Sequence, residues 1–339
     1  MRPARTAREH TMPKAIVIDQ GTHAVALRDV PMATEPPSGS VHVRPLWFGI
    51  CRSDTELLDG DFDSWAPVNY PIVPGHEWVG VVTAVGPGSD RFSIGDRVVG
   101  ECVTGHMSWF GLTYDGAGSE EFVVLERLLH DVPERISDRS AAMIEPFTVA
   151  YRALEEAGSI DASDTVVVIG GGMIGQCAAL AAHAKGALTV LVEPSAQRRE
   201  MATRLGVDAT VDPSAPDAEA TIAAVAGPLG VRVVIEASGN PHGMASAYRI
   251  VSHNGTIVQI GITAAAEVSA PLALIQAKDL TIKGITGSSG VWPRAIRFIE
   301  RSGIDLTPLA TDEFSFDEAA EAFDRSRDAS STLKVLIHP

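Results

Sequence analysis

The sequence predicts an α/β protein of two domains, one rich in β-strands and one built on a doubly wound parallel sheet. The length of 339 residues suits two domains. Residues 12–150 contain short strand-like segments broken by Gly and Pro, and from Thr165 to about Gly287 strands and helices alternate. Such alternation is typical of a parallel sheet covered by helices.

The first of these regions is expected to form a small barrel-like β domain. Turn signals at residues 35–39, 86–88 and 93–96 separate its strands. The predicted strands are residues 15–18, 41–46, 78–85, 98–102 and 121–125.

The pattern changes near Asp138, where a helix is expected over residues 140–157 with Pro146 in its first turns. The strands that follow are predicted at residues 166–169, 188–192, 231–236, 256–260 and 280–285. Helices are predicted between them and after them, at residues 176–185, 198–205, 216–226, 241–251, 295–302 and 317–326. A last strand at 333–337 ends the chain.

A βαβ unit at residues 164–193 has the glycine spacing of a dinucleotide site. The uninterrupted apolar run 166–169 suits a strand buried on both faces. Gly170, Gly172 and Gly175 follow in the pattern G-x-G-x-x-G. These glycines respectively allow a tight turn, let a pyrophosphate approach the backbone, and let the helix pack closely on the strand.

The residues after this turn complete the predicted nucleotide site. Met173 and Ile174, within the glycine pattern, are candidate cofactor-binding residues, and the start of the helix that follows would present free N–H groups to phosphates. Glu193 ends the second strand, where an acid can accept hydrogen bonds from ribose hydroxyls. Its carboxylate would repel a 2′-phosphate and so favours NAD over NADP. Arg198 and Arg199 leave NADP open, because they could bind that phosphate, pack on adenine or form a solvated helix face.

The composition limits the partners. A net charge of −16 disfavours nucleic acid and anionic membranes, and no apolar segment is long enough to cross a bilayer. Three cysteines without a C-x-x-C pair indicate a reducing compartment. We therefore expect a cytoplasmic protein that acts on a small molecule and has no nucleic-acid or membrane partner. A homo-oligomer, a dimer or tetramer, is also expected. Residues 1–11 are expected to be a disordered leader; an artefact of start-site choice and, as the less favoured alternative, a transit peptide are the other interpretations.

Three short segments offer ligands that suit zinc. Cys51 supplies a thiolate, His76 an imidazole, and Glu77 and Glu145 carboxylates. Each has a structural alternative: Cys51 as a small buried apolar residue, His76 as a hydrogen-bonded turn residue, and Glu145 as an exposed acid at a helix start. Their joint occurrence beside a dinucleotide motif favours the metal site.

With these motifs, the sequence resembles the zinc-dependent medium-chain dehydrogenase/reductase superfamily from about Met12 to Pro339. The motifs are Cys-x-Ser-Asp at 51–54, Gly-His-Glu at 75–77, Gly-Asp-Arg-Val at 95–98 and the glycine pattern at 170–175. The resemblance implies a GroES-like catalytic domain, residues 12–150 and 291–339, around a Rossmann dinucleotide-binding domain, residues 151–290. The Glu145-Pro146 pair resembles the branch of polyol, sugar and related dehydrogenases.

The resemblance also implies roles for single residues in the metal site. Cys51 and His76 would bind zinc directly, and Glu145 or Glu77 would supply a carboxylate, directly or through water. Ser53 would pass the substrate proton outward and so, with Glu77, is a candidate catalytic residue.

The same resemblance implies that Asp54 orients the first ligand segment and that Arg52 contacts the cofactor pyrophosphate. Some members of the family have a histidine five residues after the cysteine to complete the proton path. This chain has Glu56 there, which leaves the route of the proton open.

Many members of the family bind a second, structural zinc through four cysteines after the Gly-Asp-Arg-Val turn. Residues 101–110 contain only Cys102. We therefore expect one zinc ion per subunit. Cys102 and His106 could form half a site, but a strand residue and a loop residue are the favoured interpretation.

The predicted activity is hydride transfer between a secondary alcohol of a polyol, sugar or cyclitol and NAD(P). Zinc would lower the pKa of the substrate hydroxyl, and the cofactor would take the hydride. Trp65, Trp109, Phe110 and Tyr114 fall where relatives line the substrate pocket, although such aromatic residues are equally compatible with an ordinary core. The alternatives are a zinc-free quinone or enone reductase of the same superfamily and a catalytically idle nucleotide-sensing protein.

Overall fold

The computed structural model describes residues 12–263, 265 and 267–339, so the predicted leader at 1–11 lies outside the described residues. The fold is mixed α/β, as predicted, and divides into two compact units. The first unit contains the described residues up to Val132 together with Asp312–Arg327 and Val335–Pro339, and the second contains Pro133–Thr311 and Asp328–Lys334. The predicted domain limits at residues 150 and 291 stay predictions.

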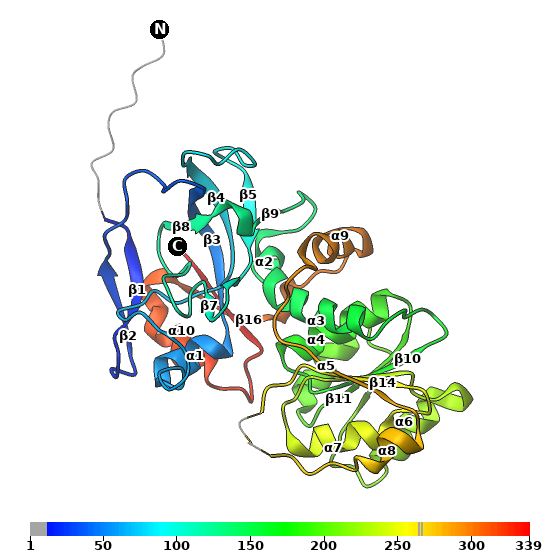
Figure 1. Cartoon of the computed structure of the whole chain (residues 1–339). Helices are drawn as coiled ribbons and strands as arrows, with labels where there is room; N and C mark the ends of the chain where they lie inside the picture. Colours follow the sequence, from blue (N-terminus) through cyan, green and yellow to red (C-terminus); the bar gives the residue numbers. More distant parts are fainter. Residues whose placement is uncertain (1–11, 264, 266) are drawn as a thin grey trace. The chain divides into compact units, whose positions relative to one another are not determined.

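The first unit is organised by a seven-stranded sheet (Figure 1). Its strands are β16 (Ala310–Ser315), β17 (Lys334–His338), β3 (Ser40–Ile50), β4 (Glu77–Val85), β5 (Arg97–Gly100) and β9 (Leu129–Asp131) in that spatial order, and β8 (Phe122–Leu125) also pairs with β3. The pairs from β17 to β9 are antiparallel. Two hairpins complete the strands, β1 (Lys14–Ile18) with β2 (Val25–Asp29) and β6 (Val103–Gly105) with β7 (Ser108–Trp109).

The apolar core of the first unit packs against one face of this sheet. Val41 and Val43 of β3 are completely buried and alternate with residues on the other face, as expected for a strand with one face in the core. Phe323 from α10 (Ala319–Ser326) joins the same apolar cluster. The C-terminal strand β17 adds Val335, which lies opposite Ile50, so the end of the chain completes the sheet begun near its start.

The second unit contains a six-stranded parallel sheet with helices on both sides (Figure 1). The spatial order is β12 (Ala209–Val211), β11 (Leu188–Val192), β10 (Thr165–Ile169), β13 (Val233–Glu236), β14 (Thr256–Gln259) and β15 (Thr281–Gly284). The chain runs from β10 outward through β11 to β12 and then returns to β13 on the other side of β10. The strand order therefore reverses between β10 and β13, where open parallel sheets bind their ligands.

The helices of the second unit follow the predicted alternation. They are α2 (Asp138–Ala141), α3 (Ile144–Glu156), α4 (Met173–Ala184), α5 (Ala196–Arg204), α6 (Ala218–Ala226), α7 (Pro241–Ile250), α8 (Ala273–Ala277) and α9 (Trp292–Ser302). The helix expected over 140–157 is thus divided in two. Pro146 lies in the first turn of α3, where a missing N–H leaves no helical hydrogen bond unmade.

Two differences from the predicted elements concern functional segments. Helix α4 begins at Met173 rather than at residue 176, because Gly172 is already its extended N-cap residue and Gln176 N donates to Gly172 O. Helix α1 (Arg52–Asp59) was not predicted; it begins directly after Cys51 and ends at Gly60, whose φ of 81° is left-handed. A short, mostly polar segment gives little periodic signal for such a helix.

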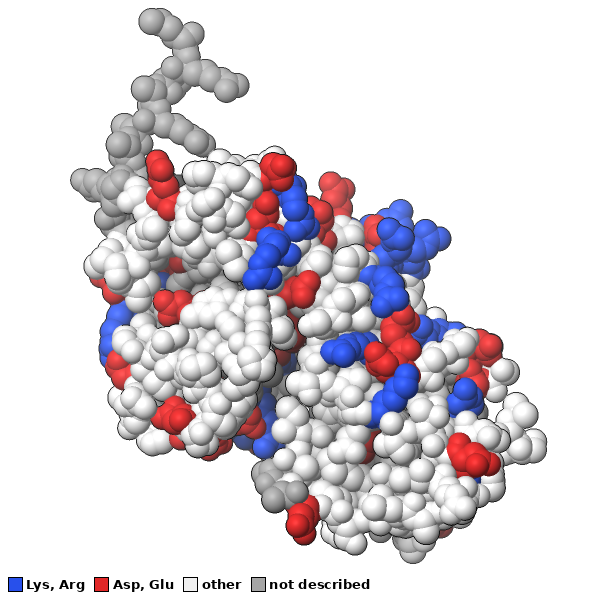
Figure 2. All heavy atoms as spheres, viewed as in Figure 1, with Lys and Arg blue, Asp and Glu red and all other residues white. Residues whose placement is uncertain are grey.

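Among the described residues, no helix has the length and apolar character needed to cross a membrane. On the face drawn in Figure 2, Lys and Arg side chains lie between Asp and Glu side chains.

Candidate functional site

Cys51, His76 and Glu77 come together in the first unit. The candidate ligand atoms of the three side chains all lie within 4.8 Å of one another, and His76 and Glu77 are buried. The pairing of β3 with β4 causes this approach, because Gly49 near the end of β3 lies opposite Glu77 at the start of β4. Cys51 follows two residues after Gly49 as the N-cap residue of α1.

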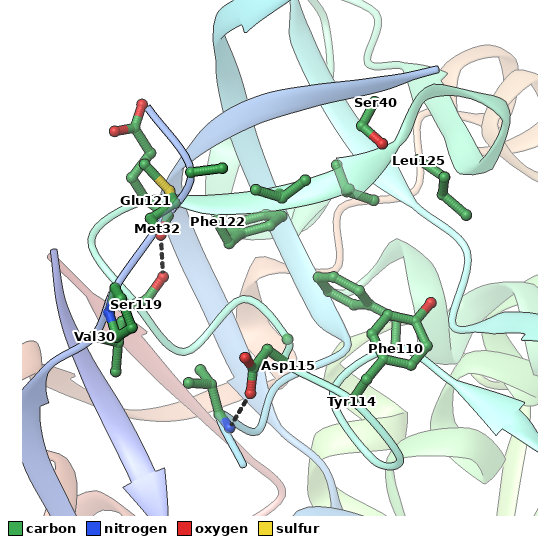
Figure 3. Close-up of a pocket in the computed structure, with 16 residues that line it drawn as sticks. Val30, Met32, Ser40, Phe110, Tyr114, Asp115, Ser119, Glu121, Phe122 and Leu125 are labelled. Carbon is green, nitrogen blue, oxygen red and sulfur yellow. Dashed lines mark hydrogen bonds between the residues drawn. The ribbon is translucent and has the colours of Figure 1, made fainter. Parts of the chain in front are cut away.

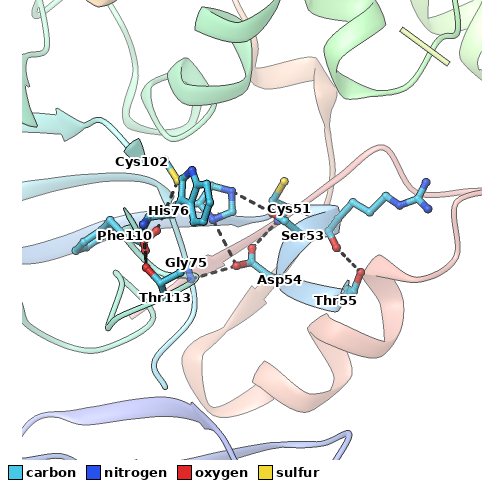
Figure 4. Close-up of polar contacts among 11 residues, drawn as sticks. Cys51, Ser53, Asp54, Thr55, Gly75, His76, Cys102, Phe110 and Thr113 are labelled. Atoms are coloured by element: carbon cyan, nitrogen blue, oxygen red, sulfur yellow. Dashed lines mark hydrogen bonds and ion pairs between the residues drawn. The ribbon is translucent and has the colours of Figure 1, made fainter. Parts of the chain in front are cut away.

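Asp54 ties the two ligand-bearing segments together (Figure 4). Its buried carboxylate accepts hydrogen bonds from Cys51 N at 2.8 Å and from Gly75 N at 3.2 Å. The same carboxylate lies 3.5 Å from Nδ1 of His76. One acid in the first turn of α1 therefore joins both segments, whereas the resemblance implied a role for it in the first segment alone.

The negative groups around His76 favour a positive charge on its imidazole. Burial by itself lowers the pKa of His76, but the Asp54 carboxylate, the Cys102 sulfur and hydrogen bonds to Asp54 and Cys51 together hold that pKa well above its usual value. The hydroxyl oxygen of Ser53 lies 3.4 Å from Nε2 of the same ring. Since Asp54 lies at Nδ1, Nε2 is the ring atom left to bind a metal.

These residues fit a zinc ion. A thiol, an imidazole and a carboxylate are the donor types of catalytic zinc sites, and three protein donors leave one position for substrate. A carboxylate at the second nitrogen of a ligating histidine is the usual arrangement behind such a site. Glu145 lies in the second unit, half-buried in the first turn of α3, and its part in the metal site stays a prediction.

The remaining predicted residues of the first unit lie outside the cluster. The Arg52 side chain is largely exposed and its Nε donates to Glu56 at 2.8 Å. Cys102 is buried, with its Sγ 3.7 Å from Phe110 O, and His106 is exposed. Neither Cys102 nor His106 belongs to the ligand group.

The four candidate substrate-pocket aromatics fall into two groups. Trp65 is 54% exposed and forms ring contacts with Phe62 at 4.9 Å and with Trp109 at 5.9 Å between centroids. Phe110 and Tyr114 instead line a cavity of about 390 Å³ within the first unit (Figure 3), whose lining includes none of the three clustered ligands. In that cavity Asp115 accepts a hydrogen bond from Val73 N, and burial raises the pKa of Asp115.

The second unit holds the glycine-rich turn at the carboxyl end of β10. Gly170 has a left-handed φ of 98°, which glycine adopts without strain. A Cβ on Gly175 would lie 1.8 Å from Gly170 O, so no other residue fits at that contact between helix and strand. Gly172, Met173 and Ile174 are half-buried at the start of α4, whose first N–H groups have no helical acceptor. Such an uncapped helix start can bind a pyrophosphate.

Glu193 is buried and already helps to hold this turn. Its two carboxylate oxygens accept hydrogen bonds from Gly171 N at 2.6 Å and from Ser195 N at 2.8 Å. A carboxylate has about four acceptor positions, so two are left for ribose hydroxyls.

The two arginines after Glu193 are both engaged with carbonyl oxygens of the second unit. Arg198 donates to Ala329 O at 2.6 Å and to Thr332 O at 3.3 Å. Arg199 donates to Glu193 O at 2.6 Å and forms an ion pair with Asp212. Binding of a 2′-phosphate would compete with these contacts.

Sequence reasoning missed the acid at the end of β13. Glu236 is buried there and accepts hydrogen bonds from Ser238 and Gly239. A sequence signal was present, because Glu236, like Glu193, ends an apolar strand of the alternating region.

Comparison with known proteins places similar sequences along nearly the whole chain. A family model described as zinc-binding dehydrogenase matches residues 173–301, and one described as alcohol dehydrogenase GroES-like domain matches residues 37–134. The sorbitol dehydrogenase of Halalkalibacterium halodurans is 27% identical over 96% of this chain and 99% of its own length. The 2-dehydro-3-deoxy-L-galactonate 5-dehydrogenase of Pseudoalteromonas atlantica is 30% identical over 90% of this chain and 93% of its own.

A solved structure has the same fold. The short chain alcohol dehydrogenase of Escherichia coli CFT073, complexed with NADH, superposes with a TM-score of 0.86 and 26% sequence identity. The alignment covers 97% of this chain and all of the other.

Proposed function

The chain belongs to the zinc-dependent medium-chain dehydrogenase/reductase superfamily and is an NAD(P)-dependent alcohol or polyol dehydrogenase, and we propose that its substrate is a secondary alcohol of a polyol, sugar or cyclitol. The proposal includes one zinc ion per subunit, NAD as the hydride acceptor, and a cytoplasmic dimer or tetramer. The observation that carries the zinc part is the convergence of Cys51, His76 and Glu77.

A bound zinc ion would act as a Lewis acid that lowers the pKa of the substrate hydroxyl. Cys51 and Nε2 of His76 would hold it, with Glu77 or Glu145 as the carboxylate. Asp54 keeps the imidazole oriented through Nδ1. Ser53 Oγ, near Nε2, would accept the hydroxyl proton and pass it outward.

The contacts of Glu193 and its neighbours support NAD over NADP. The buried carboxylate of Glu193 would lie against a 2′-phosphate and repel it, whereas its remaining acceptor positions suit ribose hydroxyls. Arg198 and Arg199 would have to give up contacts with carbonyl oxygens in order to bind that phosphate.

The substrate class is supported by an exposed aromatic surface and by the relatives. Trp65 presents an indole, in contact with Trp109, that could stack on the carbon face of a sugar or cyclitol ring. The curated relatives include dehydrogenases of sorbitol and of D-arabitol-phosphate.

One experiment tests the proposal: metal analysis of the purified protein, with NADH formation followed on a panel of polyols, sugars and cyclitols. We expect about one zinc ion per chain and activity on a member of the panel. Cys51→Ala should lose zinc and at least about 100-fold in kcat, while NADH binding persists; Cys177→Ala, a buried cysteine of α4, is the matched control and should keep its zinc. Zinc-free wild-type protein that reduces enones, or that binds NADH without activity, contradicts the proposal.

A further inference from the structure

Glu236 lies at the point where the parallel sheet reverses its strand order. It is the last residue of β13 and pairs with Ile169, the last residue of β10, on one side and with Gln259 of β14 on the other. The loops that follow these three strands therefore emerge beside one another at the carboxyl edge of the sheet. A dinucleotide on a doubly wound sheet lies across this edge.

The side chain of Glu236 holds the loop after β13. It is 1% exposed, and its carboxylate accepts hydrogen bonds from Ser238 N at 2.9 Å, from Ser238 Oγ and from Gly239 N at 3.4 Å. Its backbone carbonyl accepts from both Ile260 N and Gly261 N at 2.9 Å, which also fixes the loop after β14. Burial of a carboxylate is costly unless donors surround it, so this acid has a specific task.

The same loops are packed too closely for side chains. A Cβ on Gly170 would lie 2.8 Å from Ser238 N, and a Cβ on Gly261 would lie 2.6 Å from a Glu236 carboxylate oxygen. A Cβ on Gly243, in the first turn of α7, would lie 2.6 Å from Ser238 Oγ. The loop after β10, which would bind pyrophosphate, therefore rests directly on the loop that Glu236 positions.

The two halves of a dinucleotide can be assigned to the two sides of β10. Glu193, the predicted ribose acid of the adenosine half, follows β11, and β11 pairs with one side of β10. The other side of β10 pairs with β13. Because the cofactor extends across the reversal point, its nicotinamide half is directed toward the loops after β13 and β14.

We propose that Glu236 is a positioning residue for the nicotinamide half of the cofactor, acting through the backbone of residues 238–239 and 260–261. The inference rests on the proposed dinucleotide site. Glu236 touches no reacting atom in this scheme. It holds the loops after β13 and β14 in a fixed conformation before the cofactor binds. A residue that only stabilises the fold would not distinguish the two halves of the cofactor, and this difference provides the test.

The test compares NADH with ADP, which lacks the nicotinamide half. In Glu236→Gln, one acceptor oxygen becomes an amide donor that faces N–H groups, so we expect the Kd for NADH to rise about tenfold or more while the Kd for ADP stays within about twofold. Asp208→Asn is the matched control. Asp208 lies in the same unit and accepts a hydrogen bond from Thr189 N at 2.9 Å. It directly precedes β12 and so lies at the amino ends of the strands, away from the loops that would bind the cofactor. The Asp208→Asn change should leave both Kd values unchanged.

A second variant keeps the proposal open to refutation if Glu236→Gln does not fold. Ser238→Ala removes the hydroxyl that donates to Glu236 and accepts from Asn240 N at 3.0 Å, and leaves the Glu236 carboxylate in place. We expect it to weaken NADH binding about two- to fivefold with ADP binding unaffected. Equal losses for NADH and ADP, or no loss for either ligand, would overturn the inference. A wild-type protein that binds neither ligand would overturn the proposed function and this inference with it.

Discussion

The two units build their candidate sites from different parts of the chain. In the first unit the chemistry is in side chains: Cys51, His76 and Glu77 come from the ends of two paired strands. In the second unit it is in the backbone, where glycines and the start of α4 leave N–H groups and space for phosphates. A side-chain site is lost when atoms are removed, whereas a backbone site is lost when a single methyl group is added.

Both sites nevertheless use the same support. Asp54 accepts hydrogen bonds from backbone N–H groups of the two segments that carry Cys51 and His76. Glu193 accepts them from Gly171 N in the glycine-rich turn and from Ser195 N after β11. In each case a buried carboxylate, directly after a β-strand or in the first turn of a helix, joins two backbone segments by hydrogen bonds. The supports are alike, and the difference between the sites lies in what the fixed loops present.

The largest effect that would test this contrast is expected from Gly175→Ala. The new Cβ would lie 1.8 Å from Gly170 O, so the contact between α4 and the turn has to open. An overpacked contact of this kind costs about 3 kcal/mol, and we expect NADH binding to weaken about 100-fold or more. Zinc content should be unchanged, because the proposed metal ligands of the first unit are not involved.

Gly284→Ala is the control for that experiment, since a Cβ at Gly284 meets no atom within 4 Å. It should leave the Kd for NADH within about twofold of the wild-type value, as measured by fluorescence titration. If Gly175→Ala binds NADH as well as Gly284→Ala does, the second site does not depend on backbone clearance.

A smaller effect is expected from Asp54→Asn in the first unit. The variant keeps all proposed ligands but weakens the group that orients Cys51 and His76, and the loss of such a partner typically lowers metal affinity about 10- to 100-fold. Competition with a zinc chelator measures the change. Asp59→Asn on the same helix is the control, because Asp59 pairs with Arg327 and should leave zinc affinity unaltered. Equal zinc affinities in the two variants would mean that Asp54 does not position the ligands.

The contrast also explains what could be predicted from the sequence. The nucleotide turn was recognisable because its strand, glycines, helix and acid are consecutive within residues 164–193. The predicted α/β fold is confirmed. It too could be predicted from the sequence, because alternation of strand and helix is a local pattern. The predicted start of α4 at residue 176 was wrong by three residues, since the helix begins at Met173. Gly175 lies inside the helix, and a glycine gives no sequence signal for a helix.

The candidate ligand group of Cys51, His76 and Glu77 could not be derived from its spacing in the sequence. Cys51 and His76 are separated by 25 positions, and only the pairing of β3 with β4 brings them together. Helix α1 escaped prediction because it is short and mostly polar. Glu236 has a local signal, as the acid that ends an apolar strand, but its contacts with the loops after β10 and β14 arise only in the folded chain.

The smallest expected effect concerns stability, where the units also differ. Burial lowers the pKa of His42 in the first unit, although Glu121 partly opposes this, whereas burial raises the pKa of Glu236 in the second. An unfolded histidine takes up its proton near pH 6.5, and the folded His42 does so only at lower pH. Below about pH 6.5 the unfolded state therefore binds more protons, and the free energy of unfolding falls as the pH falls. Glu236 acts in the opposite direction, since a raised carboxyl pKa contributes stability at low pH that is lost as the pH rises.

Replacement of His42 by Gln should remove its part of this pH dependence. We expect the free energy of unfolding of the first unit to change less between pH 7 and pH 5 in His42→Gln than in the wild type, by at most about 1.4 kcal/mol per pH unit. Denaturant unfolding, followed by hydrogen exchange of β3 amides, measures the slope for this unit alone. His106→Gln, at an exposed position of the same unit, should keep the wild-type slope. A slope in His42→Gln that equals that of His106→Gln would mean that the buried histidine is not what makes the first unit sensitive to acid.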